Sequence, residues 1–233
     1  VGVVILEPMR YSEPDRDFLR LVRDECLSRG IVLIFDEISC GFRFNNSAVH
    51  LDIDITPDMV VFSKSLGNGF PIACVAGRKE VMEAARISFI SSTTHTECVG
   101  FAAMNAVLEY YENNDVADGL AQRGKAIRDI LLNAADRYGL EVTTKGLDQL
   151  WSWSFKFDDD TNRMLQTIVT ESMLRNSILF SNRFYSTLGI DPDMYILFER
   201  AILIAFKKVS KIINDGDEPS KHIEFGLNRL GIY

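Results

Sequence analysis

The sequence has no apolar run that approaches the roughly eighteen residues of a membrane-spanning helix. It opens with Val1–Glu7, which has no basic segment and too short an apolar stretch for a signal peptide. Basic residues are in deficit: 25 Lys and Arg against 33 Asp and Glu give a formal net charge of −8. This balance argues against a surface that binds duplex nucleic acid, because neutralising phosphates needs clustered Lys and Arg. The acidic balance does not exclude a binding site for small anionic ligands, since helix N-termini and a few Lys or Arg side chains bind such ligands locally.

The four cysteines form no pattern typical of a metal site. Cys26, Cys40, Cys74 and Cys98 include no CxxC pair, and none has a His partner at metal-ligand spacing. At least two of them lie in apolar runs, where a free Cys behaves as a small hydrophobic residue. We therefore expect no metal, and a cytoplasmic location, because the reducing cytosol is the default compartment for such a chain.

The chain also lacks a starting Met, and its first residues already belong to a predicted strand. It reads as the C-terminal part of a longer protein. Its composition is otherwise ordinary for a soluble globular protein, with 47% hydrophobic and 25% charged residues. At about 150 residues per domain, this length predicts one large domain or one and a half.

The first half alternates short apolar runs with longer amphipathic ones. Continuous apolar strands joined by helices or long connections predict an α/β fold with a mainly parallel sheet covered on both faces. The apolar runs predict strands at residues 3–6, 31–35, 59–62 and 72–77. Helical spacing predicts helices at 15–29 and at about 79–86, 97–113 and 115–138.

The second half changes character near residues 113–115, where we place a domain boundary. Residues 141–144 and 150–157 alternate in the manner of half-exposed antiparallel strands. A helix at about 160–176, a strand at 178–180 and a helix at 193–213 complete a predicted α+β unit. The aromatic residues at 151, 153, 155 and 157 share one strand face, and we expect them to pack in a core.

Two carboxylates follow a buried strand, since Ile31–Glu37 reads IVLIFDE. Ligands of open α/β sheets bind at the carboxyl ends of parallel strands, which makes Asp36 a candidate site residue. A second interpretation is structural: Asp36 ends the strand and caps the next turn. A third is a Walker B strand of a nucleotide-binding protein, although its companion phosphate loop is absent from these residues.

A lysine stands between two apolar strands and is followed at once by a Gly-rich turn, in the run Val60–Ala73, VVFSKSLGNGFPIA. Lys is almost never buried without a partner or a purpose. A desolvated Lys64 would have a lowered pKa and could form a Schiff base with a carbonyl. An exposed loop lysine is the alternative.

Asp36 and Lys64 are 28 residues apart, each at the end of a predicted strand of one sheet. Pyridoxal phosphate (PLP) requires these two groups: a Lys for the Schiff base and an acid at its ring nitrogen, which keeps the ring protonated. A Walker B strand does not account for Lys64, so the pair favours a PLP site.

At this point the chain resembles the class III aminotransferases, PLP enzymes of fold type I, and within them the glutamate-1-semialdehyde 2,1-aminomutase-like branch. The matching stretches are LEP at 6–8, IFDEISCGFR at 34–43, TPD at 56–58, SKSLGNGFPI at 63–72 and ISST at 90–93. The resemblance is strong to about residue 112 and weaker beyond. It implies that residues 1–113 are the later portion of the large PLP-binding domain and residues 114–233 a smaller α+β domain.

The resemblance also implies roles for single residues. Asp36 would bind the pyridine nitrogen, Lys64 would hold the cofactor, and Ile38 would lie against its ring. Thr93 matches a residue that reaches the cofactor phosphate of the other subunit, which implies a homodimer with shared sites. The phosphate loop and the aromatic residue stacked on the ring would precede Val1.

The implied function is a PLP-dependent aminotransferase or aminomutase that moves an amino group on a small amino or carbonyl substrate. Ser12 stands where dual-substrate members carry a Glu, which fits the aminomutase-like branch better. The turn Thr94–Glu97 differs from that of true aminomutases, so both reactions stay open. His95 and Arg183 are weaker candidates for cofactor and substrate contacts. The alternative is a catalytically silent fragment or pseudo-enzyme that acts only by subunit association.

Overall fold

The computed structural model describes residues 1–91 and 97–226. The described residues form two compact units, which divide between Gly119 and Leu120 and are called unit 1 and unit 2. The chain passes from one unit to the other within helix α5 (Val116–Arg137), slightly later than the boundary that the sequence predicts.

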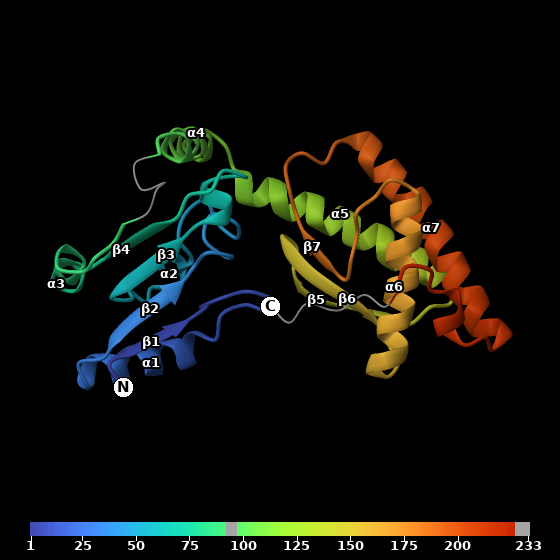
Figure 1. Ribbon diagram of the computed structural model, residues 1–233, viewed down its shortest axis with the longest axis horizontal. Helices are drawn as coiled ribbons and strands as arrows, with labels where there is room; N and C mark the ends of the chain where they lie inside the picture. Colours follow the sequence, from blue (N-terminus) through green and yellow to red (C-terminus); the bar gives the residue numbers. More distant parts are fainter. Residues whose placement is uncertain (92–96, 227–233) are drawn as a thin grey trace. The chain divides into compact units, whose positions relative to one another are not determined.

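Unit 1 is built on a four-stranded sheet in the order β1-β2-β3-β4 (Figure 1). The first three strands run parallel and β4 pairs antiparallel with β3, as expected for a mainly parallel α/β sheet. Each strand coincides with a predicted apolar run. Their bounds are β1 Val3–Leu6, β2 Val32–Asp36, β3 Met59–Phe62 and β4 Cys74–Gly77.

The helices of unit 1 follow their sequence signals except for two short segments, α2 and η1. Helix α1 begins after Asp15, whose side chain accepts a hydrogen bond from the amide of Phe18. The helix ends before Gly30, which has a left-handed backbone conformation. The five-residue helix α2 was not predicted, because it is too short to show a helical period. The helical segments are α1 Arg16–Ser28, α2 Val49–Ile53, η1 Lys64–Leu66, α3 Lys79–Met82, η2 Glu83–Arg86 and α4 Val99–Asn113.

A buried carboxylate joins four elements of unit 1. Asp58, 2% exposed, lies just before β3 and accepts a hydrogen bond of 2.8 Å from the amide of Leu33 in β2. It also pairs with Arg23 of α1 at 3.0 Å and with Arg78, which follows β4, at 2.8 Å. Because a buried charge is costly unless it is paired and hydrogen-bonded, these partners make Asp58 a fixed point of the fold.

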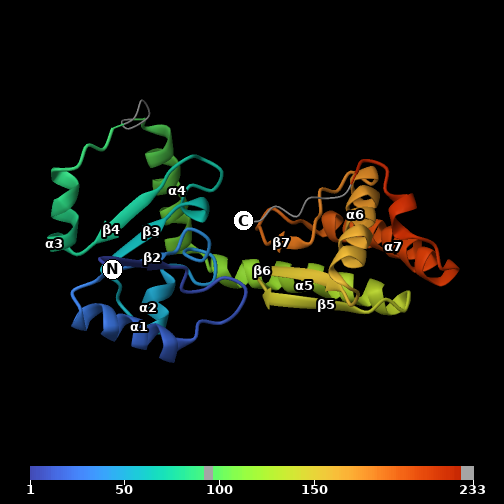
Figure 2. The same ribbon diagram turned by 60° about the horizontal axis from the view of Figure 1, so that its bottom comes forward.

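Unit 2 contains a three-stranded antiparallel sheet in the order β5-β6-β7, on which helix α6 packs. Helices α6 and α7 lie side by side in both ribbon views (Figures 1 and 2). Besides most of α5, its elements are β5 Val142–Leu147, β6 Leu150–Phe155, α6 Asp159–Arg175, β7 Arg183–Tyr185, α7 Pro192–Asp215 and η3 Pro219–His222.

Aromatic side chains of β6 form the centre of the unit 2 core, as predicted. Trp151, Trp153 and Phe155 are all nearly inaccessible to solvent. The indole N–H of Trp151 donates to the backbone oxygen of Gly124, so this buried polar atom is satisfied. Phe157 departs from the prediction: it lies beyond the end of β6 and is 45% exposed.

The strand predicted at 178–180 is wrong. The amide of Ile178 bonds to the backbone oxygen of Met173 and Ser177 has a positive φ, so these residues close the C-terminus of α6. The apolar signal there reflects Phe180, which is 5% exposed and stacks on Trp153. The third strand of the sheet comes later, as β7.

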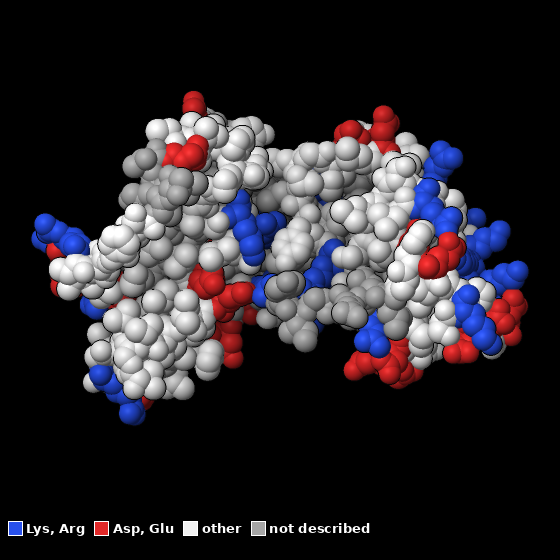
Figure 3. All heavy atoms as spheres, in the orientation of Figure 1, with Lys and Arg blue, Asp and Glu red and all other residues white. Residues whose placement is uncertain are grey.

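The charged surface of unit 2 carries both signs. On the face shown in Figure 3, basic and acidic side chains are interspersed over the region of α6 and α7. Among the described residues, no helix combines the length and the apolar character needed to cross a membrane.

We expect Asp58→Ala to destabilise unit 1 by about 3 kcal/mol, because it leaves the Leu33 amide and two guanidinium groups without their partner. Hydrogen exchange at the amides of β2 and β3 measures this loss. The matched control is Glu25→Ala, which removes an exposed pair with Arg29 and should cost about 0.5 kcal/mol or less.

Both tryptophans lie in unit 2, so their fluorescence on unfolding in urea is an internal reference that should not change. Equal exchange rates in the two variants would show that Asp58 is not the fixed point described above.

Candidate active site

The parallel pairing of β2 and β3 brings the two candidate residues to one edge of the sheet. Asp36 is the last residue of β2 and pairs in register with Val61 of β3. Lys64 follows two residues after the end of β3 and begins the turn η1. Both therefore lie at the carboxyl edge of neighbouring parallel strands, where open α/β sheets bind ligands.

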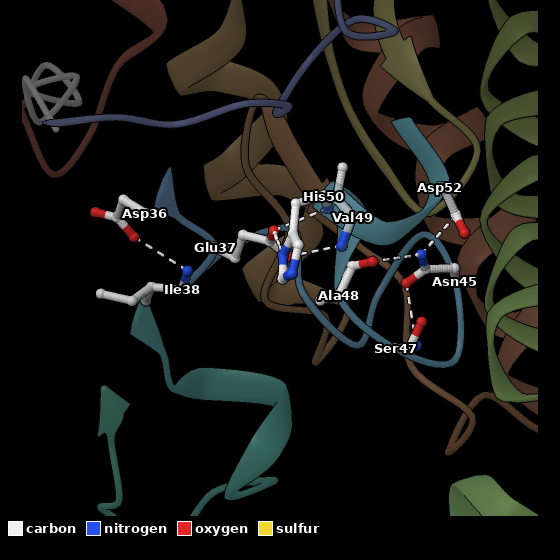
Figure 4. A network of polar contacts seen from close by, with 9 residues as sticks. All are labelled: Asp36, Glu37, Ile38, Asn45, Ser47, Ala48, Val49, His50 and Asp52. Carbon is white, nitrogen blue, oxygen red and sulfur yellow. Dashed lines mark hydrogen bonds and ion pairs between the residues drawn. The ribbon is translucent and has the colours of Figure 1, made fainter. Parts of the chain in front are cut away.

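The neighbouring carboxylates Asp36 and Glu37 point to opposite sides (Figure 4). Asp36 is half-buried, and its Oδ1 accepts a hydrogen bond of 3.0 Å from the amide of Ile38. Its Oδ2 has no hydrogen-bond partner among the residues that the structure describes. The turn-capping interpretation is thus compatible with a site role, because capping uses only one of the two oxygens.

Glu37 is 1% exposed and holds the start of α2. Its oxygens accept hydrogen bonds from the amides of Val49 at 2.6 Å and His50 at 2.9 Å, and Oε1 lies 2.7 Å from the His50 ring. A carboxylate at a helix N-terminus satisfies amides that have no partner within the helix. Glu37 therefore fixes both ends of the loop between β2 and α2.

This loop is tightly packed at Gly41. A Cβ there would lie 2.8 Å from the ring of Phe62 and 2.9 Å from the backbone oxygen of Glu37, so the position requires glycine. The preceding Cys40 is completely buried, and burial together with the negative charge of Glu37 raises the pKa of its thiol to about 12.

Lys64 has a strained backbone. Its φ is +44°, in the left-handed region that residues other than glycine rarely adopt, at a cost of about 1–3 kcal/mol. Such strain is concentrated at functional sites, where it sets the direction of a side chain. The Nζ atom of Lys64 donates a hydrogen bond of 2.7 Å to Oγ of Ser39.

The expected burial of Lys64 is not found, because its side chain is exposed. The residue stands beyond the last pair of β3, in a turn at the sheet edge, and the described residues do not cover it. Lys64 is therefore distinguished by its strained backbone, its position at the sheet edge and its contact with Ser39, and not by desolvation.

Ser39 and Arg43 are site residues that the sequence analysis missed. Ser39 is 4% exposed, and Arg43 is 8% exposed. Arg43 Nε donates to the backbone oxygen of Ser39 at 3.0 Å, and Nη2 donates to Oγ of Ser65 at 3.2 Å. Their position in the loop directly after Asp36 was the available signal.

The remaining candidates lie at different places. Ile38 follows the two carboxylates and is half-buried. Thr93 and His95 lie outside the described residues. Arg183 is the first residue of β7, in unit 2, and is half-buried.

A model of the aminotransferase class III family matches residues 1–195, most of the chain. The chain belongs to the class III aminotransferases. The resemblance seen in the sequence is thereby confirmed, as is PLP, the cofactor of that family.

Two curated relatives are named for different reactions, an aminomutase and a transaminase. Glutamate-1-semialdehyde 2,1-aminomutase of Pyrobaculum arsenaticum is 34% identical over an alignment of 170 residues, which covers 68% of this chain and 39% of that protein. The 2'-deamino-2'-hydroxyneamine transaminase of Streptomyces kanamyceticus is 30% identical over 177 residues, 76% of this chain and 43% of that protein. The chain therefore spans less than half the length of these class III relatives.

Two solved structures share its fold. The PLP internal aldimine form of the FumI protein from Sphingopyxis sp. MTA144 superposes with a TM-score of 0.84 at 22% identity, covering 95% of this chain and 55% of that one. An omega-transaminase from Sphaerobacter thermophilus gives a TM-score of 0.72 at 20% identity, covering 88% and 51%. These likenesses confirm the predicted PLP-transferase fold.

The raised pKa of Cys40 predicts a thiol that does not react in the folded protein. Thiol reagents react with the ionised thiolate form of cysteine. With a pKa of about 12, only a minute fraction of Cys40 is ionised at pH 8.5. We expect iodoacetamide at pH 8.5 to label the exposed Cys98 and to leave Cys40 unmodified until urea is added, as measured by peptide mass mapping. Cys98→Ser should remove the early labelling of that peptide and leave Cys40 unmodified as before.

The same shift has a definite sign for stability. In the unfolded chain the thiol ionises near its usual pKa of about 8.5, whereas in the folded chain it stays neutral up to about 12. The contribution of the neutral Cys40 thiol to the free energy of unfolding is therefore fully present below pH 8.5. It is lost as the pH rises toward 12, because ionisation then favours the unfolded chain. A Cys40 peptide labelled as fast as the Cys98 peptide would show that the thiol is neither buried nor neutral.

Proposed function

We propose that the protein containing this chain is a PLP-dependent aminotransferase or aminomutase that holds its cofactor through a Schiff base at Lys64. The observation that carries the proposal is the placement of the Lys64 amine and the Asp36 carboxylate at one edge of adjacent parallel strands in a class III chain. The groups suit this cofactor: within the described part of the chain, the amine has a single hydroxyl contact and the carboxylate has one oxygen without a hydrogen-bond partner.

The two residues have separate tasks in this proposal. When bound, PLP supplies an electron sink for the carbanion formed at the substrate carbon. Oδ2 of Asp36 holds the proton on the ring nitrogen, and Nζ of Lys64 carries a proton between the substrate carbon and the cofactor carbon. Ile38 would lie against the cofactor ring, as the resemblance implies.

The substrates are proposed only as a class: small amino donors and carbonyl acceptors. The relatives include both an aminomutase and a transaminase at about 30% identity, so neither reaction is favoured by similarity alone. The aminomutase-like branch is our choice, because Ser12 replaces the Glu expected of dual-substrate members. A mutase would turn over with one substrate, whereas a transaminase needs a second carbonyl compound.

We further propose a cytosolic homodimer with shared sites. Thr93, through its match to the family motif, would contact the cofactor phosphate of the other subunit. All four cysteines of the chain are free thiols, which suits a reducing compartment.

The central test separates Lys64 from Asp36 in the full natural polypeptide. Lys64→Ala removes the covalent attachment, so borohydride should no longer fix PLP to the chain. Asp36→Asn should retain borohydride fixation at Lys64 but lose the charged partner of the ring nitrogen. Each 1.36 kcal/mol of barrier costs tenfold in rate, and we expect a fall in transamination on the order of a hundredfold, since charge-assisted contacts are strong. Peptide mapping and steady-state kinetics measure the two effects.

The matched control is Lys79→Ala, which alters an exposed lysine of α3 away from the sheet edge and should behave as the wild type. Cofactor found on any lysine other than Lys64 would refute the assignment. No adduct in the wild-type protein would instead favour the catalytically silent alternative.

The shared site predicts complementation between subunits. Dimers that mix a Lys64→Ala subunit with a Thr93→Ala subunit have one doubly damaged site and one intact site. Activity should therefore reappear when the two inactive variants are unfolded, mixed and refolded, and should not reappear when either is refolded alone. A protein that analytical ultracentrifugation shows to be monomeric, and that is fully active at the same dilution, would exclude active sites shared between subunits.

A further inference from the structure

We propose that Ser39 is the positioning residue of the Lys64 amine. The inference rests on the proposed function, because it concerns the lysine that would hold PLP. The hydroxyl of Ser39 lies 2.7 Å from Nζ, and it is the only hydrogen-bond partner of that atom among the described residues.

The amine needs such a partner because its side chain is exposed and long. A lysine side chain has four rotatable carbon–carbon bonds, and without a contact its amine samples many positions. The positive φ of Lys64 sets the direction in which the side chain leaves the backbone. The hydrogen bond to Ser39 then fixes the far end, so backbone and tip are both restrained.

Ser39 itself is held in place from several sides. It is 4% exposed, and its backbone oxygen accepts a hydrogen bond from the buried guanidinium of Arg43. Its loop is closed by the bond of 2.8 Å from the Gly41 amide to the backbone oxygen of Glu37. The hydroxyl is therefore preorganised, and little order is lost when it binds the amine.

A hydroxyl suits an amine that must change its protonation state. Ser can accept a hydrogen bond from an ammonium group and can donate one to a neutral amine. A carboxylate at the same place would favour the ammonium form, which is not nucleophilic. The nearby Glu37 points away from this side of the strand, toward α2 (Figure 4).

The test measures how fast the apoprotein of the full natural polypeptide captures added PLP, followed by absorbance and by borohydride fixation at Lys64. We expect Ser39→Ala to slow covalent capture about tenfold, and Ser39→Thr, which keeps the hydroxyl, to stay within about threefold of the wild type. The matched control is Ser63→Ala. The hydroxyl of Ser63 donates to the backbone oxygen of Ile72 and does not contact Lys64.

A second arm separates positioning from a structural role. Noncovalent PLP binding is measured in Lys64→Ala with and without Ser39→Ala. If Ser39 acts only through Lys64, the second substitution changes nothing. A comparable loss of affinity in this background, or wild-type capture by Ser39→Ala, would overturn the proposal.

Failure of the proposed function has a different outcome, in which the wild type itself forms no adduct at Lys64. That result would remove the basis for Ser39 as well. Should Ser39→Ala fail to fold, Ser39→Cys gives the same comparison, because its thiol is a weak hydrogen-bond partner of similar size.

Discussion

The parallel hydrogen bonding of β2 to β3 is the constraint on which the candidate site depends. It aligns the carboxyl ends of the two strands, and only there can Asp36 and the turn at Lys64 share an edge. Asp58 secures this alignment at the opposite end, where its backbone and side chain both bond to Leu33. Because Asp58 also binds arginines from α1 and from the end of β4, loss of this one carboxylate would loosen the whole sheet.

Asp36 ends β2 and Glu37 follows it, and the two acids have different roles because their side chains point to opposite sides. Asp36 points to one side, where only one of its oxygens has a hydrogen-bond partner among the residues that the structure describes. Glu37 faces the interior, where three donors surround it. The buried acid thus shapes the loop, and the half-buried acid remains available for a ligand.

Sequence reasoning recovered the elements that depend on local pattern. The strands of unit 1 coincide with continuous apolar runs, and the pairing of β5 with β6 follows from alternation. It failed where tertiary contacts decide. Residues 178–180 carry a strand-like apolar signal, yet their backbone completes a helix end and Phe180 is drawn into the core. The location of Asp36 and Lys64 could be predicted from motif and spacing. The contact of Lys64 with Ser39 could not be predicted, because it depends on a left-handed backbone conformation that lysine rarely adopts and that the sequence does not indicate.

The positive φ of Lys64 sets stability against chemistry at a single position. Glycine adopts this conformation without steric strain, whereas a lysine there costs the fold about 1–3 kcal/mol. Selection for stability alone would therefore replace Lys64 by glycine, whereas selection for the proposed chemistry retains the lysine. A drift of this position toward glycine would mark descendants in which the site has been released from its task.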